Sequence, residues 1–195
     1  MNYLIIHGYQ STAQRFSQEA DIDTPVDPSS LGDRRQVMAL IQDGRIQEAI
    51  EKINDIDPEL LDTNPSLHFS LLRLQLIELI REGFDSNDGN VQPAIDFAMA
   101  HLSQRAPNNP QFLADLEKTM ALLCFPPDSL IPQLKELMDV KLRREIANKV
   151  NLALMTNQGV QGEPRIHNLI NLWSWGEALL SEKVDFPRLE RNDLF

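Results

Sequence analysis

Histidine and cysteine are the residues of this chain best suited to metal binding or nucleophilic chemistry. The four histidines, His7, His68, His101 and His167, are scattered along the sequence, and no two stand four residues apart. Cys124 is the only cysteine. A structural zinc site needs a set of Cys and His ligands at close spacing, so this distribution argues against such a site and against a zinc RING. We expect each histidine to be a surface or half-buried side chain.

A nucleophilic role is the other chemistry that Cys124 could have. It lies in the segment MALLCFPP, at the end of an apolar stretch with no base beside it in sequence. A reactive thiol needs surroundings that lower its pKa, whereas a free cysteine commonly fills space in a core. We therefore expect Cys124 to be a core residue. The chain also has no phosphate-binding or nucleophile-elbow glycine motif.

Two groups of acidic residues could imitate a site. The segment DSNDGN, residues 85–90, has the composition of a calcium loop, but its glycine is the fifth residue where calcium loops have the sixth. Asp55, Asp57 and Glu59 lie in a polar stretch between predicted helices. We interpret both groups as solvated surface turns. The sequence therefore predicts a protein that is not an enzyme and binds neither cofactor nor metal.

Charge and composition restrict the classes of partner and compartment. Lys and Arg total 18 against 29 Asp and Glu, giving a formal charge of −11. Binding to nucleic acid or to an anionic membrane needs a basic face, so we expect neither partner. No apolar run approaches the ~20 residues of a membrane span. A single cysteine and the lack of a basic leader fit a cytoplasmic and nuclear protein.

The spacing of apolar residues predicts helices throughout. Ile46, Ala49, Ile50 and Ile53 form one stripe at helical period. Residues 66–81 are apolar on almost every side, and such a helix must be buried all round, by its own domain or by a partner. No segment alternates between polar and apolar residues as a strand does. The predicted fold is all-α, with successive antiparallel helical hairpins forming an elongated helical bundle.

Glycine and proline mark the breaks between the first helices. A short helix over residues 1–7 is expected to end at Gly8, and a second to run from about Ser11 to Ala20. Residues 21–30 are acidic, contain two prolines and are predicted to be a linker. The helix that follows from Leu31 is expected to end at Gly44, because glycine suits the left-handed position that closes many helices.

Three stretches resemble, in order, the modules of the LisH–CTLH–CRA family. The LisH pattern is carried by Tyr3-Leu4, Gly8-Tyr9, Thr12-Ala13, Phe16 and Glu19. The segments IQDGRIQEAIEKINDIDPELLDTN and LHFSLLRLQLIELIR resemble the CTLH module, and AIDFAMAHL, LEKTMALLCF and LWSWGEALLSEKVDFPRL are similar to the CRA module. The resemblance divides the chain into a partial LisH motif (1–20), a linker (21–30), a CTLH module (31–88) and a CRA module (89–195).

The resemblance implies a non-catalytic scaffold. Family members are subunits of the GID/CTLH RING-type E3 ubiquitin ligase, which supports proteasomal degradation of substrates such as gluconeogenic enzymes. The implied partners are sister LisH–CTLH–CRA subunits, RING-bearing CTLH subunits and the armadillo-type adaptor of the substrate-receptor arm. A homodimer or a heterodimer of this chain is also implied. One difference from the family concerns the LisH pattern, in which a further helical turn precedes the position that Met1 has here. The alternatives are a stand-alone helical adaptor outside any ligase and a helical enzyme without a familiar motif.

The candidate partner-binding residues are large apolar side chains of three segments. They are Tyr3, Leu4, Tyr9 and Phe16 of the LisH-like stretch, Phe69, Leu71, Leu72, Leu76 and Leu79 of residues 66–81, and Trp173 and Trp175 near the C-terminal end. Core burial is the commoner fate of leucine, so a bundle core is the alternative for Leu72, Leu76 and Leu79. The tryptophans are two residues apart and face different sides of a helix. We expect one in a core, with Trp173 favoured, and one exposed as an interface residue.

Overall fold

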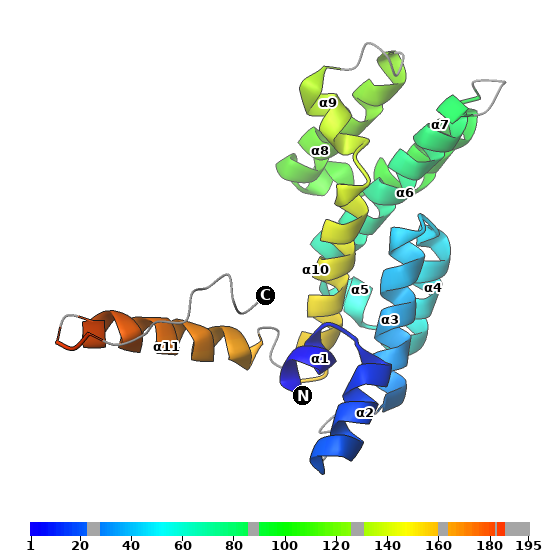
Figure 1. The fold of residues 1–195 in the computed structure, drawn as a ribbon. Helices are drawn as coiled ribbons and strands as arrows, with labels where there is room; N and C mark the ends of the chain where they lie inside the picture. The colour runs from blue at the N-terminus through cyan, green and yellow to red at the C-terminus, as the bar shows by residue number, and fades with distance from the viewer. Residues whose placement is uncertain (23–27, 86–89, 126–130, 160–163, 182, 186–195) are drawn as a thin grey trace. The chain divides into compact units, whose positions relative to one another are not determined.

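The computed structural model describes residues 1–22, 28–85, 90–125, 131–159, 164–181 and 183–185 (Figure 1). All regular elements among these residues are helical and none is a strand, which confirms the all-α prediction. The chain divides into two compact units, residues 1–28 with 161–195, and residues 29–160. None of the helices in the described ranges combines the length and the hydropathy of a membrane span.

The first unit combines both ends of the chain. It holds α1 (Asn2–Ile6), α2 (Gln10–Ala20) and α11 (Arg165–Ser181). Gly8 has φ of +71° in the turn between α1 and α2, a conformation that glycine adopts without the steric cost of a Cβ. The side-chain oxygen of Asn2 accepts a hydrogen bond from the backbone N–H of Arg165 at 2.9 Å. This bond ties α1 to the first residue of α11.

The second unit is the larger. Its helices are α3 (Pro28–Gln42), α4 (Ile46–Ile56), α5 (Leu60–Thr63), α6 (Pro65–Asp85), α7 (Gln92–Phe97) with its π-helical continuation η1 (Ala98–Leu102), the 3-10 turn η2 (Ala106–Asn108), α8 (Pro110–Met120), the 3-10 turn η3 (Ala121–Cys124), α9 (Pro132–Leu137) and α10 (Lys141–Asn157). The start of α3 at Pro28 precedes the predicted start at Leu31. Proline fits a first helical turn because no N–H is needed there. Residues 23–27 of the predicted linker lie outside the described residues.

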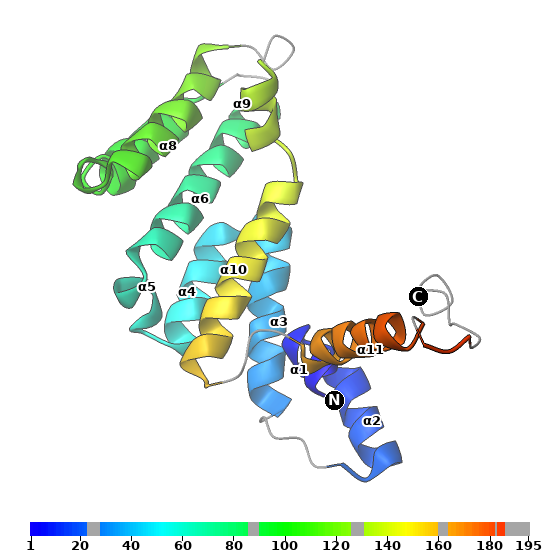
Figure 2. The same ribbon diagram turned by 90° about the vertical axis from the view of Figure 1, so that its left-hand side faces the viewer.

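A helical hairpin of α3 and α4 opens the second unit (Figures 1 and 2). Gly44 lies in its turn with φ of +84°, as predicted for the end of this helix. The predicted apolar stripe of α4, from Ile46 to Ile53, is buried. Its burial fixes which side of α4 faces the core.

Helix α6 is the centre of the second unit. It contacts α4, α5, α7, η1, α8 and α10, and Figure 2 shows α6 with α10 beside it. Leu71, Leu74, Leu76, Ile77 and Ile80 are almost completely inaccessible to solvent. The apolar sides of α6 are therefore covered by neighbours within its own unit.

Candidate partner-binding surfaces

The histidines of the chain are divided between its two units, with His7 and His167 in the first and His68 and His101 in the second. Among the described residues, no group of three or more His, Cys, Asp or Glu side chains could hold a metal ion. His7 packs against Tyr3, with ring centroids 4.4 Å apart, and His101 packs against Phe97 at 4.7 Å. His167 is exposed on α11. His101 is near enough to His68 for its charge to add to the effect of burial, which lowers the pKa of His68.

His68 is the histidine with a shifted pKa. Partial burial lowers the pKa, and the positive charge of Arg105 lowers it further. The Arg105 Nη1 atom lies 3.2 Å from His68 Nδ1. Burial and this contact together disfavour the protonated form of His68.

Cys124 is exposed, so the prediction that it is a core residue was wrong. It ends the 3-10 turn η3, in which Leu122 is the buried residue. In such a turn, only side chains three residues apart lie above one another. Cys124 is two residues after Leu122, so it lies on a different side of the turn. The acidic segment considered as a calcium loop lies mostly outside the described residues, at 86–89.

The candidate residues of α6 lie in the core of the second unit. Phe69, Leu71, Leu72 and Leu76 are buried, and Leu79 is partly buried against the same core. Phe69 stacks on Phe112 of α8 with ring centroids 4.3 Å apart. These side chains fix the position of α6 among its neighbours.

The candidate residues of the first unit are mostly accessible. Tyr3, Tyr9 and Phe16 are 40%, 50% and 39% exposed, and Leu4 is half-buried. Trp175 is 62% exposed, whereas Trp173 is half-buried. Trp173 is thus the less exposed of the two, but it is not in a core as predicted, because no residue of α11 is buried.

Helix α11 has large apolar side chains but no buried residue. Leu169, Leu172, Trp175 and Leu179 follow one another at steps of three or four residues, so they share one side of the helix. Their exposed fractions run from 45% to 63%. Contiguous exposed apolar surface of this kind marks interaction sites. We call these four residues the α11 face.

An ionic cluster around Glu78 joins distant parts of the second unit. Glu78 accepts two hydrogen bonds from Arg81 Nη1, at 2.7 and 3.0 Å, and two from Arg143, at 2.5 and 2.8 Å. Arg143 also donates to the Gln42 carbonyl at 3.1 Å, and Arg81 to the Met138 carbonyl at 2.9 Å. The hydrogen bond to Glu78 raises the pKa of Arg143. The cluster fixes the start of α10 against α6 and the end of α3.

Sequence reasoning did not identify the Glu78 cluster. The available signal was a carboxylate in the middle of an otherwise apolar helix, because a buried charge requires paired charges and hydrogen bonds. Its partner Arg143 is 65 residues away in sequence. No local pattern links two residues at that separation.

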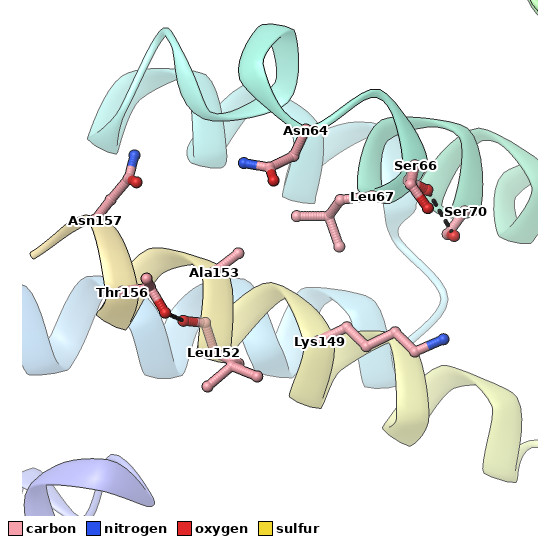
Figure 3. Close-up of a pocket in the computed structure, with 9 residues that line it drawn as sticks. All are labelled: Asn64, Ser66, Leu67, Ser70, Lys149, Leu152, Ala153, Thr156 and Asn157. Carbon is pink, nitrogen blue, oxygen red and sulfur yellow. Dashed lines mark hydrogen bonds between the residues drawn. The ribbon is translucent and has the colours of Figure 1, made fainter. Parts of the chain in front are cut away.

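An open groove runs between α10 and the α5–α6 region (Figure 3). Its volume is about 470 Å³, and its lining is Asn64, Ser66, Leu67, Ser70, Lys149, Leu152, Ala153, Thr156 and Asn157. Figure 3 shows the Ser70 and Thr156 hydroxyls bonded within their own helices, to the carbonyls of Ser66 and Leu152. The Asn157 amide donates to Asp57 at 2.6 Å. The hydroxyls of Ser70 and Thr156 and the amide of Asn157 therefore already have partners.

Comparison with known proteins gives a consistent set of matches. Residues 30–181 match the family described as the CTLH/CRA C-terminal to LisH motif domain. The chain is 39% identical over 194 residues to the protein GID8 homolog of Arabidopsis thaliana, covering all of this chain and 76% of that relative. It is 41% identical over 180 residues to GID complex subunit 8 of Schizosaccharomyces pombe, covering 91% and 75%. The glucose-induced degradation protein 8 homolog of Dictyostelium discoideum is 37% identical over 189 residues, covering 97% and 80%.

Proposed function

This chain belongs to the family of proteins that carry a CTLH/CRA domain C-terminal to a LisH motif, and from that membership we propose that it is a non-catalytic scaffold subunit of a GID-type RING E3 ubiquitin ligase. The observation that carries the proposal is the family match over residues 30–181. The name of the S. pombe relative, a GID complex subunit, supports the same assembly for this chain. The match to that relative covers 91% of this chain, so the similarity is not limited to one motif.

The proposed scaffold has three modules after the family pattern. In this proposal residues 1–20 form a partial LisH motif, 21–30 a linker, 31–88 the CTLH module and 89–195 the CRA module. The proposed partners are sister LisH–CTLH–CRA subunits, RING-bearing CTLH subunits and an armadillo-type adaptor, in the cytoplasm and nucleus. Such a scaffold increases the effective concentration of ligase and substrate receptor, and gluconeogenic enzymes are the proposed class of substrate.

Partner binding is proposed for the accessible candidate residues. They are the exposed Tyr3, Tyr9, Phe16 and Trp175, together with the half-buried Leu4 and Trp173. Exposed aromatic side chains support this assignment because aromatic residues are enriched at interface hot spots. We assign Phe69, Leu71, Leu72, Leu76 and Leu79 an indirect role: their burial holds α6, and with it the helices that contact α6.

Affinity purification of the full chain from its native cells, followed by mass spectrometry, tests the proposal. We expect RING-bearing CTLH subunits and an armadillo-type adaptor to be recovered with the wild-type chain. Trp175→Ala should reduce this recovery, whereas Asn171→Ala, also at an exposed position of α11, should not. Recovery of none of these subunits, with a monomeric chain by light scattering, would refute the ligase role and favour a stand-alone adaptor. Equal recovery with both variants would refute the partner-binding role of Trp175 but not the ligase role of the chain.

A further inference from the structure

A pocket of about 310 Å³ lies where the end of α3 meets the junction of α9 and α10. Its lining is Gln42, Asp139, Val140, Lys141, Arg143 and Arg144. We call it the basic pocket, because three of these side chains are cationic and one is a carboxylate. This balance is the reverse of that of the whole chain, which has a formal charge of −11.

The cations of the basic pocket differ in how far their charge is already compensated. Arg143 is bound to Glu78 and to the Gln42 carbonyl. Lys141 is 3.5 Å from Asp139, but the two side chains are 76% and 45% exposed, and exposed pairs of this kind contribute little. Arg144 is exposed and has no ion pair within the described residues. Positive charge is therefore left over in the pocket.

The backbone adds to this positive charge. Helix α10 begins at Lys141, and its first turn contains no acidic residue. A helix N-terminus carries partial positive charge, so cations there are unfavourable and anions are favourable. Asp139 offsets part of it by accepting the backbone N–H of Lys141 at 2.9 Å, a bond that lowers the pKa of Asp139. A further anion would gain from the helix end and from the side chains together.

One apolar residue is exposed among these charges. Val140 is 59% accessible at the start of α10, and it offers a contact that an inorganic anion cannot use. A long polyanion would bring many phosphates against a chain of formal charge −11, whereas a short acidic peptide would contact the pocket alone.

We propose that the basic pocket docks a short acidic peptide segment of a partner protein, with carboxylates at Lys141 and Arg144 and an apolar side chain on Val140. Arg143 is a fixed, partly buried positive charge of the pocket because Glu78 and the Gln42 carbonyl hold its guanidinium. Lys141 and Arg144 lie at the exposed rim. The rim cations set the rate and salt dependence of capture.

Fluorescence anisotropy with the purified full chain tests this proposal. The probe is a labelled short peptide of glutamates around a single leucine, in low-salt buffer. We expect saturable binding that weakens with added salt. The double variant Lys141→Gln with Arg144→Gln should weaken it roughly tenfold, since each rim charge contributes a modest amount. Replacing the leucine of the probe by serine should weaken it further through the lost contact with Val140.

The matched control is Arg35→Gln with Lys118→Gln, which removes the same residue types from exposed positions on α3 and α8. It should change peptide binding less than twofold, because the removed charges are not in the pocket. Absence of saturable binding, or equal weakening by the two double variants, would overturn the proposal. Tighter binding of inorganic phosphate or of single-stranded RNA of similar charge would also overturn it. Because no sister subunit is present, the result does not depend on whether the chain works in a ligase.

Discussion

Helices α6 and α11 both carry many large apolar side chains, but their surroundings are opposite. In α6, Leu71, Leu76 and Ile77 are completely inaccessible to solvent. In α11 no residue is buried, and Leu169 and Leu172 are 63% and 60% exposed. The difference comes from neighbours: α6 contacts helices of its own unit on several sides, whereas α11 contacts α1.

This difference separates two uses of apolar surface. Burial contributes roughly 25 cal/mol per Å² of apolar area removed from water. Helix α6 has already gained that contribution on folding, so its side chains determine stability. The α11 face has most of it still to gain, so its side chains are suited to binding. Substitutions in the two helices should therefore affect different measurements.

The largest expected effect comes from truncating a leucine in the buried helix. Leu76→Ala should lower the free energy of unfolding by about 2 to 5 kcal/mol, because it removes buried methyl groups and leaves a cavity. Leu172→Ala makes the same chemical change on α11 and should cost no more than about 0.5 kcal/mol. Urea unfolding followed by circular dichroism measures both. Similar losses for the two variants would mean that α11 is packed as tightly as α6.

The Glu78 cluster provides the next largest effect. Glu78→Gln should lower the free energy of unfolding by about 2 to 4 kcal/mol, because it leaves two guanidinium groups beside a neutral amide. Glu82→Gln is the control, since Glu82 is exposed one turn further along α6. We expect it to change stability by less than about 0.5 kcal/mol. Equal urea midpoints for Glu78→Gln and the wild type would show that the cluster does not stabilise the fold.

Local pattern predicted most of the fold, because periodicity and turn residues act over short range. The stripe from Ile46 to Ile53 identified the buried side of α4, and Gly44 identified the end of the helix before it. The surroundings of α6 and α11 could not be predicted in the same way. Both are apolar in sequence, and which one is covered depends on contacts between residues far apart in the chain. The Glu78–Arg143 bonds and the exposure of Cys124 have the same origin.

The two tryptophans of α11 allow a half-buried and an exposed apolar side chain to be compared within one helix. Trp173 is half-buried and Trp175 is 62% exposed. Trp173→Ala should lower the free energy of unfolding by about 1 to 2 kcal/mol, and Trp175→Ala by less than about 0.5 kcal/mol. Thermal unfolding of the full chain compares them. If Trp175→Ala were the more destabilising, Trp175 would be a packing residue and not a candidate for direct partner contact.

The smallest expected effect is a dependence of stability on pH that comes from α6. Because burial and Arg105 lower the pKa of His68, the unfolded chain binds a proton at this site more readily than the folded one. The stability from neutral His68 is complete above the unfolded value of about 6.5 and is lost as the pH falls below it. Urea unfolding at about pH 7.5 and about pH 5.5 should show a smaller loss for His68→Gln than for the wild type.

His167→Gln is the matched control for this prediction, since His167 is exposed on α11. It should lose as much stability on acidification as the wild-type chain, because it leaves His68 and its contact with Arg105 unchanged. The difference in stability loss between His68→Gln and His167→Gln therefore measures the effect of the surroundings of His68 on α6. If His68→Gln lost as much stability on acidification as His167→Gln, the contact with Arg105 would not persist in solution. The histidines of α6 and α11 would then have similar surroundings, and the two helices would differ only in the burial of their apolar residues.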